Sequence, residues 1–273
     1  METNESIYAK SRTVENIKDC YFYQTVELPG FGLLKGEWDL RGRVDEYFGF
    51  VPFKGKRILE LGTANGFLCF EMEKRGADVV GYDLSEKDDW DIVPFAGKIT
   101  EEQIQDRKKA IRGINNAWWL THRLLGSKAH VVYGTVYNVP QDLGMVDIVT
   151  FGSILLHLRD PFLALQKAST LARESIIVTE WQRNIPRAVY SPIIPNFVRK
   201  KYINPILYAP LFLPDPDNQS SWATWWYFTP ETIVRFLKIL GFPQARVTFH
   251  KEKFSESKKP INLFTVVGTR GKV

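Results

Sequence analysis

A glycine-containing turn and the carboxylate that follows the next apolar run are the residues of this sequence best suited to bind a ligand. The string Glu60-Leu61-Gly62-Thr63-Ala64-Asn65-Gly66 stands where an apolar run, Lys56 to Gly62, gives way to a helical pattern. Glycines let a backbone approach a ligand closely, and the free amides of a new helix can meet an anionic or polar group. Asp83 closes the run Ala77 to Asp83, where a carboxylate can accept both hydroxyls of a ribose. The combination predicts a site for a nucleoside cofactor.

The turn also bears on which cofactor would bind. A dinucleotide site favours G-x-G-x-x-G because a pyrophosphate lies against it, whereas this turn has only Gly62 and Gly66 and begins with a carboxylate, Glu60. That acid repels a pyrophosphate and suits a cationic amino-acid tail. The string resembles the first motif of the class I S-adenosylmethionine-dependent methyltransferases, acid-x-Gly-x-Gly-x-Gly, and departs from it at Ala64. The resemblance spans Gly55 to about Gly268 and implies S-adenosylmethionine as the cofactor.

The resemblance also implies a role for individual residues. Glu60 and the turn from Gly62 to Gly66 would hold the methionine moiety, and Asp83 with Leu84 would hold the ribose. The segment with Thr135 and Val136 would face the adenine. Many family members carry an acid where Thr135 stands, so backbone groups would supply that contact here.

Three further strings narrow the resemblance. They are the leader Tyr21 to Arg43, SILLHLRDP at Ser153 to Pro161, and WWYFTP at Trp225 to Pro230. Together they resemble the group around the tRNA wobble-uridine carboxymethyltransferase and related small bacterial methyltransferases.

In the wobble enzyme, cationic and phenolic side chains hold the extra carboxylate of a carboxylated cofactor, and an unpaired carboxylate in a closed site is costly. The aligned positions here are Gln24, Leu156 and Thr224. The comparison implies plain S-adenosylmethionine, with Trp38 and Arg43 lining its entrance and Gln24 facing the acceptor.

Two residues are candidate bases. Methyl transfer from a sulfonium is an in-line displacement by an activated donor, so a base is needed only where the acceptor loses a proton. His157 follows the fourth expected strand and Glu180 ends the fifth, both at the open edge of the sheet. The alternatives are a histidine that orders the loop before Asp160 and a carboxylate that binds the acceptor.

The remaining candidates for contact with the acceptor are Arg159, Trp181, Trp225 and Tyr227. Aromatic faces can surround a sulfonium or a cationic acceptor, but core packing of the same rings is the plainer interpretation. The histidines fall in unrelated elements, so no metal-ligand spacing is present.

The order of apolar runs predicts a Rossmann-like, doubly wound α/β sheet of seven strands with a C-terminal antiparallel strand. The expected strands are Lys56–Gly62, Ala77–Asp83, Ala129–Gly134, Met145–Gly152, Ser175–Trp181, Ala245–His250 and Asn262–Thr269, and the expected helices are Phe67–Gly76, Thr100–Gly126, Asp160–Leu171 and Thr229–Gly241. Residues 1–54 would form a segment over the cofactor, 55–181 with 222–273 the methyltransferase core, and 182–221 an acceptor cap.

The basic residues gather in that cap. The chain carries 36 basic and 31 acidic side chains, and the surplus of five equals the cations between Glu180 and Asp215, where no acid occurs: Arg183, Arg187, Arg199, Lys200 and Lys201. The segment also holds prolines and large apolar side chains, which favours a lid over a binding cleft. The sharper alternatives are a surface that contacts phosphates and an interfacial membrane contact.

These observations favour a small-molecule acceptor, because the cap is short and no RNA-binding module is added. A tRNA-modifying enzyme, an enzyme acting on a lipid-like acceptor at a membrane surface, and a non-catalytic cofactor-binding regulator are the rival hypotheses. No apolar run reaches the roughly 18 to 20 residues of a transmembrane segment, and no secretory signal opens the chain, so we expect a cytoplasmic protein. A homo-oligomer is left open.

Overall fold

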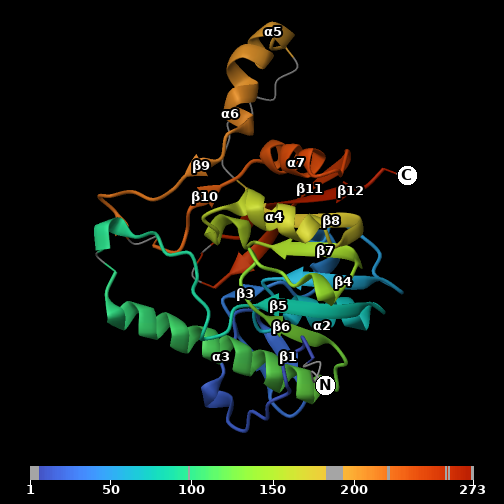
Figure 1. Ribbon diagram of the computed structural model, residues 1–273, viewed down its shortest axis with the longest axis vertical. Helices are drawn as coiled ribbons and strands as arrows, with labels where there is room; N and C mark the ends of the chain where they lie inside the picture. The colour runs from blue at the N-terminus through green and yellow to red at the C-terminus, as the bar shows by residue number, and fades with distance from the viewer. Residues whose placement is uncertain are drawn as a thin grey trace, which may run out of the picture.

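A single large sheet with helices on both faces organises the molecule. The structure is a computed structural model, which describes residues 6–97, 99–182, 193–219, 222–255, 257 and 259–271. Among these, eight strands form the main sheet in the order β3-β11-β12-β8-β7-β4-β5-β6 (Figure 1). Their bounds are β3 Trp38–Asp39, β4 Arg57–Leu61, β5 Asp78–Asp83, β6 His130–Tyr133, β7 Val146–Gly152, β8 Ala172–Trp181, β11 Gln244–Phe254 and β12 Ile261–Thr269.

The pairing follows the expected winding. Strands β6, β5, β4, β7 and β8 pair in parallel, so their carboxyl ends share one edge of the sheet. Strand β12 runs antiparallel between β8 and β11, and β11–β12 form a hairpin. The doubly wound sheet with its antiparallel final strand is thus confirmed. The extra eighth strand, β3, pairs with the end of β11 and was not expected, because two residues carry no periodic signal.

Both faces of the main sheet are buried, because alternate side chains of each strand pack under helices on opposite sides. Ile58 of β4 joins the apolar cluster beneath α2 (Phe67–Lys74) and α3 (Glu101–Leu125), while its neighbour Leu59 joins the cluster beneath α4 (Pro161–Ser169) and α7 (Pro230–Ile239). Because successive side chains of a strand point to opposite faces, neighbouring apolar residues such as Ile58 and Leu59 suit a sheet covered on both sides. The short helix α1 (Val44–Tyr47) packs on β11.

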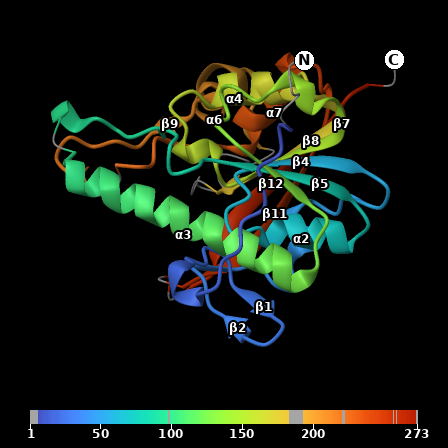
Figure 2. The ribbon, with the colours of Figure 1, turned by 60° about the horizontal axis from the view of Figure 1, so that its bottom comes forward.

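The helices begin where their capping residues predict. Thr100 and Gln103 form a reciprocal capping box at the start of α3, and Asp160 accepts the N–H of Leu163 at the start of α4, with Pro161 in its first turn. Trp118 and Trp119 of α3 are buried packing residues. The buried residues of α3 begin at Ile111, so the helix packs on the body from there to its end, whereas its first turns project beyond the body (Figure 2).

Two small sheets flank the main one. The hairpin of β1 (Val26–Leu28) and β2 (Gly32–Leu34) lies beside α3, and β9 (Leu211–Phe212) pairs antiparallel with β10 (Trp226–Tyr227). The leader that bears β1 is tied to α3 because the N–H of Tyr21 donates to the carbonyl of Gly113 at 2.9 Å. The N-terminal segment is therefore part of the packed structure where it is described.

The described part of the inserted segment differs from the expected lid. Residues 196–208 form α5 (Asn196–Val198), a π-helical stretch (Arg199–Ile203) and α6 (Asn204–Tyr208), which project away from the sheet as an arm (Figure 1). No helix within the described ranges is long and apolar enough to cross a membrane. Residues 183–192, including Arg183 and Arg187, lie outside the described residues.

Candidate functional site

A cavity lies at the carboxyl ends of β4, β5, β6 and β7. Four segments meet around it: Gly62 directly after β4, the end of β5, the loop after β6 and the loop after β7. The lining residues are Gly62, Asp83, Leu84, Asp89, Trp90, Asp91, Arg107, Gly134, Thr135, Val136, Tyr137, Ile154, His157, Leu158 and Ala223. Ligands of doubly wound sheets bind at this edge, where the strand order reverses. Six of the cofactor and base candidates predicted from the sequence meet here: Gly62, Asp83, Leu84, Thr135, Val136 and His157.

The glycine turn adopts backbone conformations that explain its composition. Gly62 and Gly66 have φ values of 81° and 83°, and a Cβ at Gly62 would come 2.3 Å from Cγ2 of Ile154. Ala64, the position at which the string departs from the family motif, also has a positive φ of 49°. A left-handed conformation costs an L-residue about 1–2 kcal/mol, so glycine is the natural residue there and the alanine is strained.

Asp83 joins the turn to the end of β5. Its carboxylate accepts the N–H of Ala64 at 2.7 Å and the N–H of Leu84 at 2.8 Å, and it lines the cavity. Burial raises the pKa of Asp83, although the two backbone hydrogen bonds oppose this shift. The carboxylate therefore has two functions in the geometry: it fixes the turn and offers acceptor oxygens to the cavity.

Glu60 is a buried carboxyl group at the head of the turn. Only 2% of the residue is exposed, and its Oε2 accepts the hydroxyl of Thr63 at 2.7 Å. Burial raises the pKa of Glu60 to about 8. Such a group is stabilised when a cation approaches it, because an opposite charge favours the ionised form.

Asn65, which the sequence analysis did not single out, links the N-terminal leader to the glycine turn through two hydrogen bonds. The side chain of Asn65 accepts the N–H of Gln24 at 2.6 Å and donates to its carbonyl at 3.2 Å. Gln24 is buried, and its Oε1 has no hydrogen-bond partner among the described residues. An unpaired buried carbonyl oxygen costs free energy, so a donor from a ligand would stabilise it.

His157 is held in one tautomer. Its Nδ1 lies 2.6 Å from the carbonyl oxygen of Ala223, and because a carbonyl only accepts, Nδ1 carries the proton. Burial lowers the pKa of His157 below its ordinary value of 6.5. The ring is therefore neutral near pH 7, and Nε2 has a free lone pair, which is the state that a general base requires.

Glu180 is buried one strand away from the cavity. Its Oε1 accepts the N–H of Leu155 at 2.8 Å, at the start of the 3-10 turn Leu155–His157. Burial raises its pKa to about 8, and hydrogen bonds from backbone amides oppose the shift. Glu180 does not line the cavity; its contacts orient the turn that carries His157.

Trp90 and Arg107 line the cavity but were not predicted. Arg107 extends from α3 and its guanidinium lies 5.8 Å from the ring of Trp90. Within the described structure, Nε of Arg107 and Nε1 of Trp90 are buried donors without partners. Burial is the main influence on the pKa values of Asp83 and His157, and the charge of Arg107 acts on both. No spacing signal connects a mid-helix arginine to strands that lie elsewhere in the chain.

The other predicted aromatic residues form a separate cluster. The ring of Trp38 lies 5.7 Å from that of Trp181 and 4.9 Å from that of Phe254, and Trp181 lies 6.4 Å from Tyr227. Nε1 of Trp38 donates to the hydroxyl of Tyr23 at 3.3 Å. This cluster lies at the ends of β3, β8 and β11 and does not contribute to the cavity with Asp83.

Arg159 and Trp225 stand behind the cavity wall. The guanidinium of Arg159 lies 5.3 Å from the ring of Trp225, and Nε1 of Trp225 donates to the backbone carbonyl of Asp91, a lining residue. The backbone N–H of Arg159 donates to the carboxylate of Asp91 at 2.6 Å. Both predicted acceptor residues thus support the loop after β5 rather than line the cavity.

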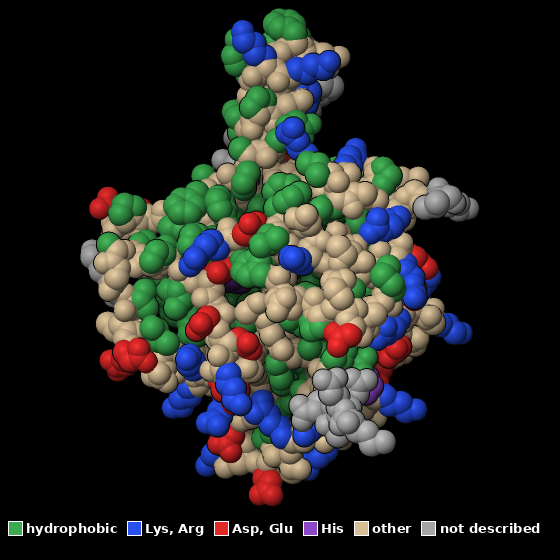
Figure 3. Space-filling view, in the orientation of Figure 1, with side chains coloured by type: hydrophobic (Ala, Val, Ile, Leu, Met, Phe, Trp, Pro, Cys, Tyr) green, Lys and Arg blue, Asp and Glu red, His purple; other side chains and the backbone are tan. Residues whose placement is uncertain are grey.

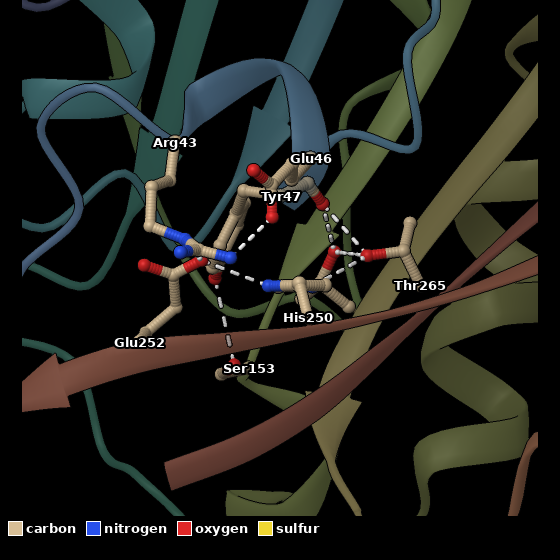
Figure 4. Close-up of polar contacts among 8 residues, drawn as sticks. Arg43, Glu46, Tyr47, Ser153, His250, Glu252 and Thr265 are labelled. Carbon is tan, nitrogen blue, oxygen red and sulfur yellow. Dashed lines mark hydrogen bonds and ion pairs between the residues drawn. The ribbon is translucent and has the colours of Figure 1, made fainter. Parts of the chain in front are cut away.

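Arg43 lies over a buried polar network instead of the cavity (Figure 4). It contacts Glu46, and its Nε lies 3.6 Å from Oε1 of Glu252. Glu252 lies 2.8 Å from Nδ1 of His250, whose Nε2 lies 3.1 Å from the hydroxyl of Thr265. The network joins α1 to the β11–β12 hairpin and holds the leader on the sheet.

The fold is that of a Rossmann-like α/β protein, with a cavity at the carboxyl edge of its parallel strands. The model of the methyltransferase domain family matches residues 39–242, and the chain belongs to that family.

Curated relatives match only a part of the chain. The ubiquinone biosynthesis O-methyltransferase of Sinorhizobium medicae is 45% identical over 53 residues, 18% of this chain and 21% of the relative. The protein with the same description from Mesorhizobium japonicum is 54% identical over 35 residues, 13% of this chain and 14% of the relative. The chain thus matches about a fifth or less of the length of these relatives.

Solved structures support the fold over most of the chain. The N-terminal domain of EvdMO1, crystallised in the presence of SAH and D-fucose, superposes with a TM-score of 0.51 at 17% identity over 93% of each chain. A chain from Bacillus halodurans superposes with a TM-score of 0.52 at 11% identity over 84% of this chain and 99% of that one.

Proposed function

We propose that this protein transfers a methyl group from S-adenosylmethionine to a small-molecule acceptor by in-line displacement. One observation carries the proposal: a single cavity joins Gly62 of the turn, Asp83, the Thr135–Val136 segment and a neutral His157. Membership of the methyltransferase domain family favours an enzyme over a cofactor-binding regulator without turnover.

The residues fit the cofactor on grounds independent of the family. Glu60 is a buried carboxyl group with a raised pKa, which suits the ammonium of a methionine moiety. Asp83 presents carboxylate oxygens to the cavity, which suit two ribose hydroxyls, and Leu84 with Val136 provides apolar surface for an adenine ring. The cofactor supplies a sulfonium-activated methyl group, so the protein has to align the acceptor and exclude water.

An oxygen acceptor fits the neutral imidazole. The two curated relatives are named as O-methyltransferases, and an acceptor hydroxyl has a proton to lose. Nε2 of His157 would take this proton, while the bond from Nδ1 to Ala223 keeps the ring oriented. Glu180 would act on the base through the Leu155–His157 turn, as a positioning residue.

Replacement of the base tests the proposal. A metabolite extract incubated with methyl-labelled S-adenosylmethionine identifies the acceptor fraction. With that fraction, His157→Gln should lower kcat by about 10²- to 10⁴-fold, the range for loss of a general base. The SAH affinity should stay within about two-fold. The matched control is His130→Gln, since His130 is exposed and stacks on Tyr8 at the amino end of β6. Equal kcat in both variants contradicts the role of His157.

Within the methyltransferase domain family, membership of the group around the tRNA wobble-uridine carboxymethyltransferase stays a proposal. The same labelling experiment covers it, because label that enters tRNA instead of small solutes would favour a tRNA enzyme, with RNA affinity falling steeply as salt rises. A cytoplasmic location is likewise a proposal from the sequence, to be tested by fractionation of cells.

A further inference from the structure

The arm that projects from the body exposes large apolar side chains. Ile193, Phe197, Tyr202, Ile206 and Phe212 are 88%, 70%, 57%, 56% and 53% exposed. Figure 3 shows apolar and basic side chains together on the projecting arm. Several large apolar side chains exposed on one projecting element mark an interaction site, because water contact with them is unfavourable.

The charge of the arm has one sign. Lys200 and Lys201 are exposed on its π-helical stretch, and the sequence contains no acidic residue between Glu180 and Asp215. Nζ of Lys201 lies 5.2 Å from the ring of Tyr202, so a cation and an aromatic side chain stand next to each other. A binding partner of the arm must therefore provide both an apolar surface and negative charge.

The base of the arm is fixed to the body. Leu207 is buried, and its carbonyl accepts the hydroxyls of Thr229 and Thr232 at the start of α7. Phe212 of β9 packs on the rings of Trp225 and Trp226, 6.2 and 5.3 Å away between centroids. The exposed apolar residues thus belong to an anchored element, whose position relative to the sheet is set by these contacts.

We propose that the arm, residues 193–212, docks the enzyme on the surface of an anionic lipid bilayer. Phe, Tyr and Ile side chains would enter the boundary between headgroups and acyl chains, while Lys200 and Lys201 would contact anionic headgroups, the arrangement that holds interfacial helices on membranes. A second copy of this chain is a poorer occupant, because a symmetric contact would bring the same cations face to face without an acid to pair them.

The arm is followed in the sequence by a residue of the cavity wall. Ala223, between β9 and β10, lines the cavity, and its carbonyl oxygen lies 2.6 Å from Nδ1 of His157. Docking is independent of the proposed methyl transfer, since vesicle binding is measured without any acceptor.

Co-sedimentation of the full chain with vesicles tests the proposal. We expect binding to phosphatidylcholine vesicles that contain about one third phosphatidylglycerol, and at least about ten-fold weaker binding to pure phosphatidylcholine. Lys200→Glu with Lys201→Glu should weaken binding to the anionic vesicles at least about ten-fold, and Phe197→Ser with Tyr202→Ser should weaken binding to them as well.

The matched control reverses two exposed lysines at the opposite edge of the sheet. Lys54 precedes β4 and Lys128 precedes β6, and Lys54→Glu with Lys128→Glu should leave vesicle binding unchanged. All variants should keep the SAH affinity and the unfolding temperature of the wild type, which separates loss of docking from loss of fold. The proposal is overturned if the wild type does not sediment with anionic vesicles or if the Lys200/Lys201 variant binds as the control does. A dimer in solution that the arm variants abolish would overturn it in favour of a second copy of this chain.

Discussion

Replacement of Asp83 by asparagine isolates the charge that the structure places at the end of β5. The carboxylate has two backbone donors, the N–H groups of Ala64 and Leu84, and it still faces the cavity. Asparagine keeps the shape and one acceptor oxygen, but it turns an NH₂ group toward one of these contacts. The variant therefore removes the negative charge and one acceptor without opening a hole.

The loss follows from the number of bonds affected. A hydrogen bond to a charged group contributes about 1.5–3 kcal/mol, and 1.4 kcal/mol is a factor of about ten in an equilibrium constant. If one bond to the ribose is lost, Asp83→Asn should bind SAH roughly 10- to 150-fold more weakly than the wild type.

Calorimetric titration with SAH measures this change. The matched control is Asp88→Asn, since Asp88 also accepts two hydrogen bonds, from the N–H and hydroxyl of Ser85 at 2.8 and 2.7 Å, but does not line the cavity. The control should bind SAH as the wild type does. If Asp83→Asn and Asp88→Asn bind SAH equally well, the assignment of the ribose to Asp83 is refuted.

Four further predictions concern the turn, the leader and the base. Because burial raises the pKa of Glu60 to about 8, the carboxyl group is mainly protonated at pH 7. Binding of a cationic methionine tail should ionise it and release up to about one proton, which calorimetry in buffers of different ionisation enthalpy measures. Glu60→Gln should abolish this proton release. Ala64→Gly should relieve the positive φ and raise the free energy of unfolding in urea by about 0.5–1 kcal/mol, and a loss of stability would contradict the strain. Asn65→Ala removes both contacts with Gln24, so limited proteolysis should cut the leader faster, while unchanged cleavage would show that the clasp is dispensable. Since the pKa of His157 lies below 6.5, its titration should lower the initial rate only below pH 7, measured at saturating S-adenosylmethionine so that titration of Glu60 does not change cofactor occupancy; a decrease between pH 8 and 7 that persists in Glu180→Gln would exclude this histidine as the base.

Local patterns were sufficient to predict the elements of the sheet. Strands such as Arg57–Leu61 and Val146–Gly152 are buried on both faces, so they appear in the sequence as short stretches in which apolar residues predominate and which stop at a glycine, Gly62 or Gly152. The capping box at Thr100 and the Asp160-Pro161 pair mark helix starts through contacts within one turn. The parallel pairing of β4 with β5 follows from the order strand, helix, strand, because such a connection needs a crossover.

Contacts between segments that are distant in the chain could not be predicted from the sequence. The clasp between Asn65 and Gln24 and the position of Arg107 in the cavity depend on how the leader and α3 lie on the sheet, and no local periodicity encodes that. Trp38 and Trp181 illustrate the same limit, because their aromatic character was evident but their mutual contact was not. The arm was expected to close over the site, yet a basic and apolar composition serves an outward surface equally well.

The position of β12 also bears on how the polypeptide is made. This strand is synthesised after every other strand of the sheet, yet it lies in the interior, between β8 and β11. While translation proceeds, β8 presents an unpaired border that could recruit another nascent chain, a hazard for incomplete sheets. Stalling the ribosome before Ile261 should therefore yield aggregation-prone intermediates that chaperones retain. After release of the chain, β12 can pair with both β8 and β11, so the edge of β8 is no longer exposed.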